Sequence, residues 1–90
     1  MKSISSVVRR VLARHLGRHA STLRVGQRLE ADLDLTPLEL VLVAAEVEEI
    51  EDVHVHADEL RGLETVGELL SVFARNAARQ RRGRALNRVA

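Results

Sequence analysis

Apolar residues repeat at helical spacing in separate stretches of the chain. Between Ser3 and Leu16 they recur every three or four residues, while the arginines of this stretch fall between them. Similar stretches run from Thr36 to about Ile50 and onward from Thr65, and a short helix is expected over Asp58–Leu63. The pattern predicts an all-α protein, a small bundle of four helices with a long loop between the first and second helices.

Two of the predicted helices begin with a capping box. Thr36 is placed to cap the second helix, with Pro37 at the first helical position and Glu39 able to reach back to the cap. Thr65 and Glu68 repeat this arrangement at the start of the last helix. The long loop that precedes the second helix has apolar residues at intervals, which predicts that it lies across the bundle. These expected anchors are Leu23, Val25, Leu29 and Leu33.

The second predicted helix is apolar on almost every side. A small domain rarely buries a helix all round, so we expect part of its surface to be exposed or covered by another chain.

The predicted domain comprises residues 1–75. Residues 76–90 are rich in Ala and Arg and only weakly periodic, which predicts a basic tail, either a frayed helical extension or a mobile segment.

Composition excludes several classes of chemistry. The 90 residues include no cysteine, which excludes disulfides, thiolate metal sites and cysteine nucleophiles. The chain lacks an apolar run of membrane-spanning length and the apolar core of a signal peptide, so we expect a cytoplasmic protein. Neither His15 with His19 nor His54 with His56 has the ligands of a convincing metal site. Because no nucleophile and base are suitably paired, we expect no enzymatic activity.

Charge is divided into three blocks along the chain. Residues 1–29 carry +7 and residues 69–90 carry +6, with no acidic residue in either block. All 13 acidic residues lie in residues 30–68, where Arg61 is the one basic residue, so that block carries −12. The terminal arginines could bind nucleic acid, but they lack aromatic neighbours for stacking and adjoin an acidic segment that repels a polyanion. We therefore favour contacts within the fold or with a protein for these arginines.

Several short motifs at matching spacing make residues 3–75 resemble an acyl carrier protein. The motifs are Leu16-Gly17, Glu30-Ala31-Asp32-Leu33, Leu38, Val47-Glu48-Glu49 and Thr65-Val66. The resemblance implies a serine at the start of the second helix that carries 4′-phosphopantetheine. In this chain the corresponding triplet is Thr36-Pro37-Leu38, so the attachment serine is replaced by Pro37. The Thr36 hydroxyl is one residue early and is expected to serve as the helix cap, so we expect no cofactor.

The resemblance also implies protein partners that dock a basic surface on the second helix. The acidic residues expected to take part are Glu39, Glu46, Glu48 and Glu49. Leu42 stands where the family usually has an acid, and Leu40, Leu42 and Val43 are expected to add apolar contact. A simpler interpretation is that these acids only solvate the end of the helix. Acids at a helix C-terminus are disfavoured by the helix dipole, however, which favours a binding role.

The sequence therefore predicts a non-catalytic protein–protein interaction module of the acyl-carrier-protein type. Its expected setting is fatty acid, polyketide or related acyl metabolism, with an acyl-processing enzyme as partner. Two alternatives remain open. One is a working carrier modified at an unexpected residue, and the other is a nucleic-acid-binding module that uses the terminal arginines.

Overall fold

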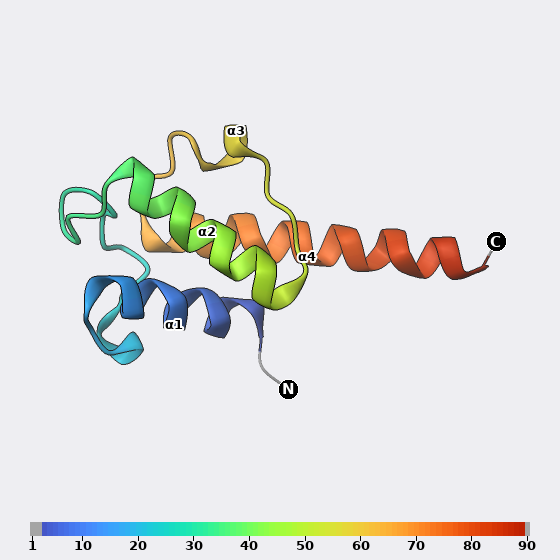
Figure 1. Ribbon diagram of the computed structural model, residues 1–90, viewed down its shortest axis with the longest axis horizontal. Helices are drawn as coiled ribbons and strands as arrows, with labels where there is room; N and C mark the ends of the chain where they lie inside the picture. The colour runs from blue at the N-terminus through green and yellow to red at the C-terminus, as the bar shows by residue number, and fades with distance from the viewer. Residues whose placement is uncertain (1–2, 90) are drawn as a thin grey trace.

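The computed structural model describes the backbone of residues 3–89 and the side chains of residues 3–83. In this range the chain forms four α-helices and one short 3-10 helix (Figure 1). They are α1 (Ile4–Leu16), η1 (Ala20–Thr22), α2 (Pro37–Glu51), α3 (Ala57–Leu60) and α4 (Val66–Val89). The predicted all-α bundle of four helices is confirmed.

Helix α1 has a cap at each end. The Ser3 hydroxyl oxygen accepts a hydrogen bond from the Ser6 amide at 3.2 Å, which satisfies one of the free N–H groups of the first turn. At the other end Gly17 has a left-handed φ of 68°, and its amide donates to carbonyls of the last turn. Glycine adopts this conformation without strain, so α1 ends where the sequence predicts.

Helix α4 begins with the second predicted capping box. The Glu68 amide donates to the Thr65 hydroxyl oxygen at 3.2 Å, and the Thr65 amide donates to the Glu68 carboxylate at 3.0 Å. The Glu64 amide donates to the same carboxylate at 2.7 Å. These backbone hydrogen bonds, first that from Glu64 and then that from Thr65, lower the pKa of Glu68 below its usual value.

Helix α3 is shorter than predicted. The sequence predicted Asp58–Leu63, but the helix begins at Ala57 and ends at Leu60. Arg61 has an extended backbone with ψ of 136°, and Gly62 has a left-handed φ of 78°. These two conformations turn the chain out of the helix before Leu63, so the predicted end was wrong.

The loop between α1 and α2 is fixed against the start of α4 by backbone hydrogen bonds. The Leu29 amide donates to the Glu64 carbonyl at 2.8 Å, and the Val66 amide donates to the Gln27 carbonyl at 3.0 Å. The bonds lie on either side of an isolated antiparallel bridge between Arg28 and Thr65. The long loop therefore has a defined place in the fold although it is largely irregular.

Three of the four predicted loop anchors are buried. Leu23, Leu29 and Leu33 lie in the core, but the side chain of Val25 is exposed, so that prediction was wrong. Val25 meets α4 through its backbone instead, because its carbonyl accepts a hydrogen bond from the Gly67 amide at 2.9 Å. A Cβ atom at Gly67 would lie only 3.1 Å from that carbonyl oxygen, so the close approach depends on glycine.

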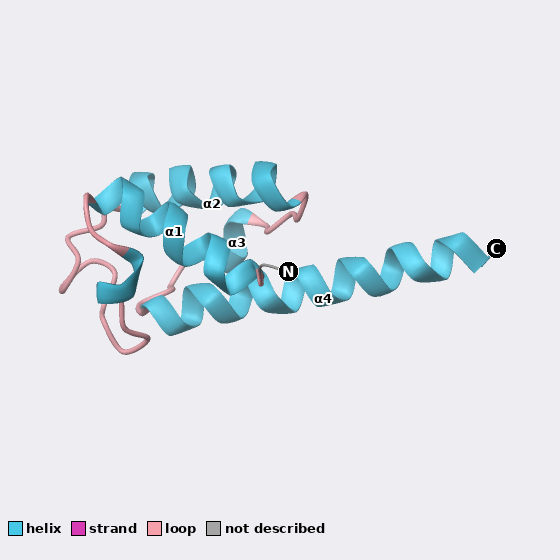
Figure 2. Ribbon diagram, turned by 90° about the horizontal axis from the view of Figure 1, so that it is seen from below, coloured by secondary structure: helices cyan, strands magenta, loops and turns pink. Residues whose placement is uncertain are grey.

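The helices share one hydrophobic core. Helix α1 packs against both α2 and α4, and Figure 2 shows α1 and α2 on one side of α4. Burial of each large apolar side chain contributes about 1.5–3 kcal/mol relative to exposure. The largest fully buried side chains are Phe73, Leu12, Leu69, Val7, Val8, Val11, Val43, Val47 and Val66.

Helix α4 continues well beyond this core (Figures 1 and 2). Its last buried side chains among the described residues are Asn76 and Ala77, and Gln80 is half-buried. The helix then projects past the ends of α1 and α2. Of the two alternatives left open for residues 76–90, a helical extension or a mobile segment, the backbone of residues 76–89 follows the helical path.

Candidate interaction surface

The start of α2 is closed by a complete capping box. The Glu39 amide donates to the Thr36 hydroxyl oxygen at 3.1 Å, and the Thr36 amide donates to the Glu39 carboxylate at 3.1 Å. Pro37 occupies the first helical position, where a missing N–H costs no hydrogen bond. Local sequence chemistry alone therefore predicted both the position and the partners of this cap.

This helix start offers no side-chain nucleophile at its first helical position. Pro37 has no reactive side-chain group, and the Thr36 hydroxyl oxygen is already engaged by the helix. Hydrogen bonds from the backbone and side chain of Thr36, in that order, lower the pKa of Glu39, with a smaller contribution from His15. Glu39 is thus ionised and serves the helix cap.

Glu46, one of the predicted docking acids, is engaged by α1. Its carboxylate forms an ion pair with Arg14, and its other oxygen lies 3.5 Å from His15 Nε2. These contacts join the middle of α2 to the last turn of α1. Glu46 is therefore a link between two helices of the bundle, with its side chain about one-third exposed.

Glu48, a second predicted docking acid, holds the segment that follows α2. Its carboxylate accepts a hydrogen bond from the Val55 amide at 3.2 Å and lies 2.9 Å from His54 Nδ1. The Gln80 side chain holds the same segment from α4, because it accepts from the His54 amide and donates to the His54 carbonyl. Glu48 thus belongs to a hydrogen-bond network that connects α2, the following loop and α4.

Glu49 is the predicted docking acid that is left facing solvent. It is exposed and has no ion pair among the described side chains. The three apolar residues that were expected to contact a partner beside these acids also differ in exposure. Leu42 is exposed, whereas Val43 is fully buried and Leu40 nearly so; the prediction that these two add surface contact was wrong.

The outer side of α2 carries an apolar stripe, of which the sequence analysis singled out Leu42 as a docking contact. Leu38 is 68% exposed and Val41 and Leu42 are each 50% exposed, and Ala45 is also on the surface. Residues at this three- and four-residue spacing lie along one side of a helix. We call Leu38, Val41, Leu42 and Ala45 the outer stripe. The even distribution of apolar residues around α2 predicted that part of this helix would be exposed, but not which face.

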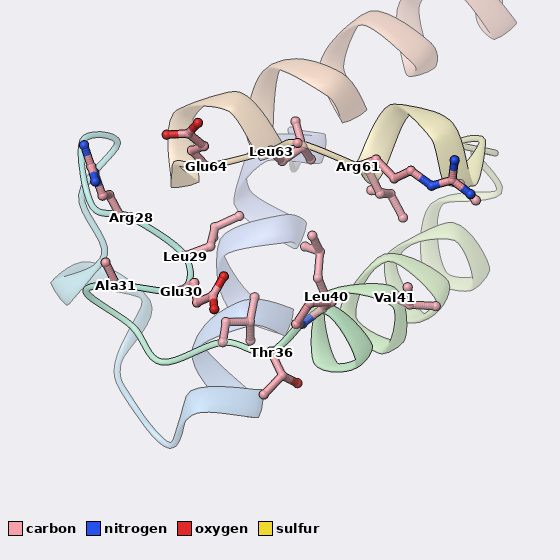
Figure 3. A pocket seen from close by; sticks show the side chains of 15 residues that line it. Arg28, Leu29, Glu30, Ala31, Thr36, Leu40, Val41, Arg61, Leu63 and Glu64 are labelled. Atoms are coloured by element: carbon pink, nitrogen blue, oxygen red, sulfur yellow. The ribbon is translucent and has the colours of Figure 1, made fainter.

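A cavity of about 940 Å³ opens beside the outer stripe, between α2, the loop before it and the α3 region (Figure 3). Leu29, Leu40 and Leu60 contribute apolar walls, and Figure 3 shows Arg28 and Arg61 at opposite ends. Val41 belongs to both the cavity wall and the outer stripe. Val41 therefore joins the outer stripe to the cavity, whose lining also includes charged residues such as Arg28 and Arg61.

The histidines do not form a metal site in the part of the chain that the structure describes. The rings of His54 and His56 are in edge-to-face contact, with centroids 4.8 Å apart. No group of three or more His, Cys, Asp or Glu residues in the described range is arranged to hold a metal ion. Among the same residues, no helix combines the length and apolar character needed to cross a membrane.

Comparison with known proteins adds no further identification. The chain matches no protein-family model, and no curated protein matches it significantly.

Proposed function

We propose that this protein is a non-catalytic interaction module of the acyl-carrier-protein type, associated with fatty acid, polyketide or related acyl metabolism. The observation that carries the proposal is the exposed outer stripe of α2, which begins at a helix start that has no serine. A large exposed apolar patch is typical of a surface that binds a partner. The proposed role is thus docking without a covalent arm.

The arrangement of elements supports the resemblance on which the proposal rests. A long anchored loop joins α1 to α2, a short α3 follows, and Thr65 and Val66 open α4. The resemblance implies the same order of elements. Replacement of the expected serine by Pro37 favours a chain that keeps the docking helix and dispenses with the phosphopantetheine arm.

The outer stripe indicates a different kind of docking from the acidic contact that the sequence predicted. Leu38, Val41 and Leu42 supply the central apolar contact, which gains about 25 cal/mol per Å² of apolar surface removed from water. Glu49 lies further along the helix and suits a basic group at the rim of the partner. A complementary partner therefore presents an apolar ridge with a basic residue at one end.

Phosphopantetheine transfer tests the carrier resemblance. The full chain is incubated with coenzyme A and a phosphopantetheinyl transferase of broad specificity, and intact mass is measured. We expect no mass gain for the natural chain or for Pro37→Ala, and addition of one phosphopantetheine group to Pro37→Ser. A modified natural chain would support the alternative of a working carrier, and an unmodified Pro37→Ser would contradict the carrier resemblance.

Photocrosslinking tests the docking surface. A photoreactive amino acid is placed at Leu42, on the outer stripe, or at Ser71, an exposed position of α4 that serves as the matched control. In the native cells we expect a specific crosslink to an acyl-processing enzyme from Leu42 only. Glu49→Lys should weaken capture of that enzyme without loss of helicity. Equal crosslinking from both positions would contradict the proposed surface.

A further inference from the structure

The end of α4 projects from the bundle, and docking through α2 does not explain this projection. We call residues 81–89 the α4 extension; it begins directly after Gln80, whose side chain bonds to the His54 backbone. The extension projects past the rest of the bundle in both views (Figures 1 and 2). Isolated helices this short are marginal in water, so the extension gains stability if a partner receives it.

The α4 extension and the turns before it are strongly basic. Residues 69–90 carry six arginines and no acid. Arg81 and Arg82 are exposed and have no ion pair among the described side chains, whereas Arg79 at the base of the extension lies 3.6 Å from Glu59. The extension therefore offers cationic groups that the bundle does not neutralise.

The arginines are spaced so that they fall on two sides of the helix. Of the four arginines in the α4 extension, those at positions 81, 84 and 88 repeat at intervals of three and four, which is the repeat of a single helix face. Position 82 stands alone on another side of the helix, because each residue advances the chain by about 100° around the helix axis. A helix with positive charge on two sides suits a groove that has negative charge on both walls.

We propose that the α4 extension binds double-stranded DNA by lying in the major groove. That groove is wide enough for an α-helix and has a phosphate backbone along each side. The deep, narrow major groove of duplex RNA does not admit a helix in this way. A membrane-surface helix needs a broad apolar face, and Arg82 interrupts the side of the α4 extension that faces away from the other three arginines.

The structure also removes the electrostatic objection to a polyanionic partner. All acidic residues lie within residues 30–68, which fold into the bundle. A rise of about 1.5 Å per residue carries the α4 extension up to roughly 13 Å past Gln80. This reach exceeds the Debye length of about 8 Å at physiological salt, so the outer part of the extension is largely screened from the acidic block.

Fluorescence anisotropy of the full chain with a labelled DNA duplex of mixed sequence tests the proposal. We expect a Kd of about 10⁻⁶–10⁻⁴ M at physiological salt and tighter binding at low salt, with a log–log salt slope of about −3 to −4 for the four arginines of the extension. Arg81→Gln with Arg82→Gln should reduce the magnitude of that slope by about 2. The matched control, Arg10→Gln with Arg24→Gln, removes the same charge from exposed bundle positions and should leave the slope unchanged.

Circular dichroism confirms that each variant remains folded before binding is compared. Absence of duplex binding at low salt would overturn the proposal, as would an equal loss of slope in both paired variants. A duplex RNA of the same sequence, a single strand and phosphatidylserine vesicles are measured in parallel. Binding to any of these as tight as that to duplex DNA would also overturn it, because the major-groove geometry would then be unnecessary.

Discussion

Thr36 ties the long loop to α2 through two hydrogen bonds with Glu39, each 3.1 Å long. Thr36→Ala removes the acceptor of the Glu39 amide, and we expect the free energy of unfolding to fall by about 1 kcal/mol. Thr36→Ser keeps the hydroxyl and should retain most of the stability. Urea denaturation of both variants measures the difference, and an equal loss in the two would contradict a role for the hydroxyl as cap.

Glu39 and Glu68 make the free energy of unfolding depend on pH in the acidic range. Hydrogen bonds lower the pKa of both carboxyl groups below the usual 4.5 in the folded state. A lowered folded pKa adds stability above the unfolded pKa, and this stability is lost as pH falls through the folded pKa. Glu39→Gln with Glu68→Gln keeps an acceptor at each capping box, so we expect a shallower decline of stability below about pH 4.5.

Thermal unfolding across acidic pH measures this effect of the two carboxyl groups. Glu30→Gln with Glu49→Gln is the matched control, because it removes two charges from exposed residues outside the capping boxes. An equal change in the slope of Tm against pH for both double variants would contradict the assignment to the caps.

Residue roles were predictable where the partner lies within one helical turn. Thr36 and Glu39 are three positions apart, so sequence spacing brings them together once a helix forms. Glu46 meets Arg14 only because α1 and α2 pack together, and Glu48 meets His54 because the chain turns back after α2; no simple sequence spacing encodes either distance. Hence the sequence identified acidic candidates for docking but not which of them the fold would engage internally.

At the scale of the element, α2 shows how a helix apolar on all sides is divided by packing. Leu40 is 8% exposed and Leu42 is 50% exposed, because residues two positions apart point to different sides of a helix. Leu40→Ala should lower the free energy of unfolding by about 2–5 kcal/mol, because it leaves a cavity in the core. Leu42→Ala should change it by about 0.5 kcal/mol or less. Chemical denaturation of the two variants would contradict this division if their losses were equal.

Helix boundaries and helix faces differ in how much the sequence reveals. The ends of α1 and the start of α2 follow from caps, so they were predicted closely. The face of α2 that enters the core could not be predicted, because its apolar residues have no dominant period. The end of α3 was missed because the left-handed turn at Gly62 follows a helix of only one turn.

At the scale of the whole molecule, the acidic block and the end of the basic C-terminal block occupy different parts of the structure. The acidic block forms most of the region from the long loop to the start of α4, whereas the basic C-terminal block extends α4 out of the bundle. The sequence predicted opposite blocks but not their separation in space, which depends on α4 remaining helical after the core ends. Docking through α2 and DNA binding through the α4 extension thus use different surfaces and can be tested separately.

Gly83 allows this independence to be measured. A Cβ atom there would meet nothing within 4 Å, and glycine costs about 1 kcal/mol relative to alanine inside a helix. Gly83→Ala should therefore raise helicity and duplex affinity, whereas Gly83→Pro should lower both by breaking the α4 extension.

The last buried side chain of α4 in the described range is Ala77, so neither variant should change the free energy of unfolding of the bundle by more than about 0.5 kcal/mol. Helicity, duplex affinity and the free energy of unfolding are measured for the natural chain and both variants by circular dichroism, duplex titration and urea denaturation. If Gly83→Pro instead destabilised the bundle as strongly as Leu40→Ala, the extension would belong to the cooperative core and the two surfaces would be coupled.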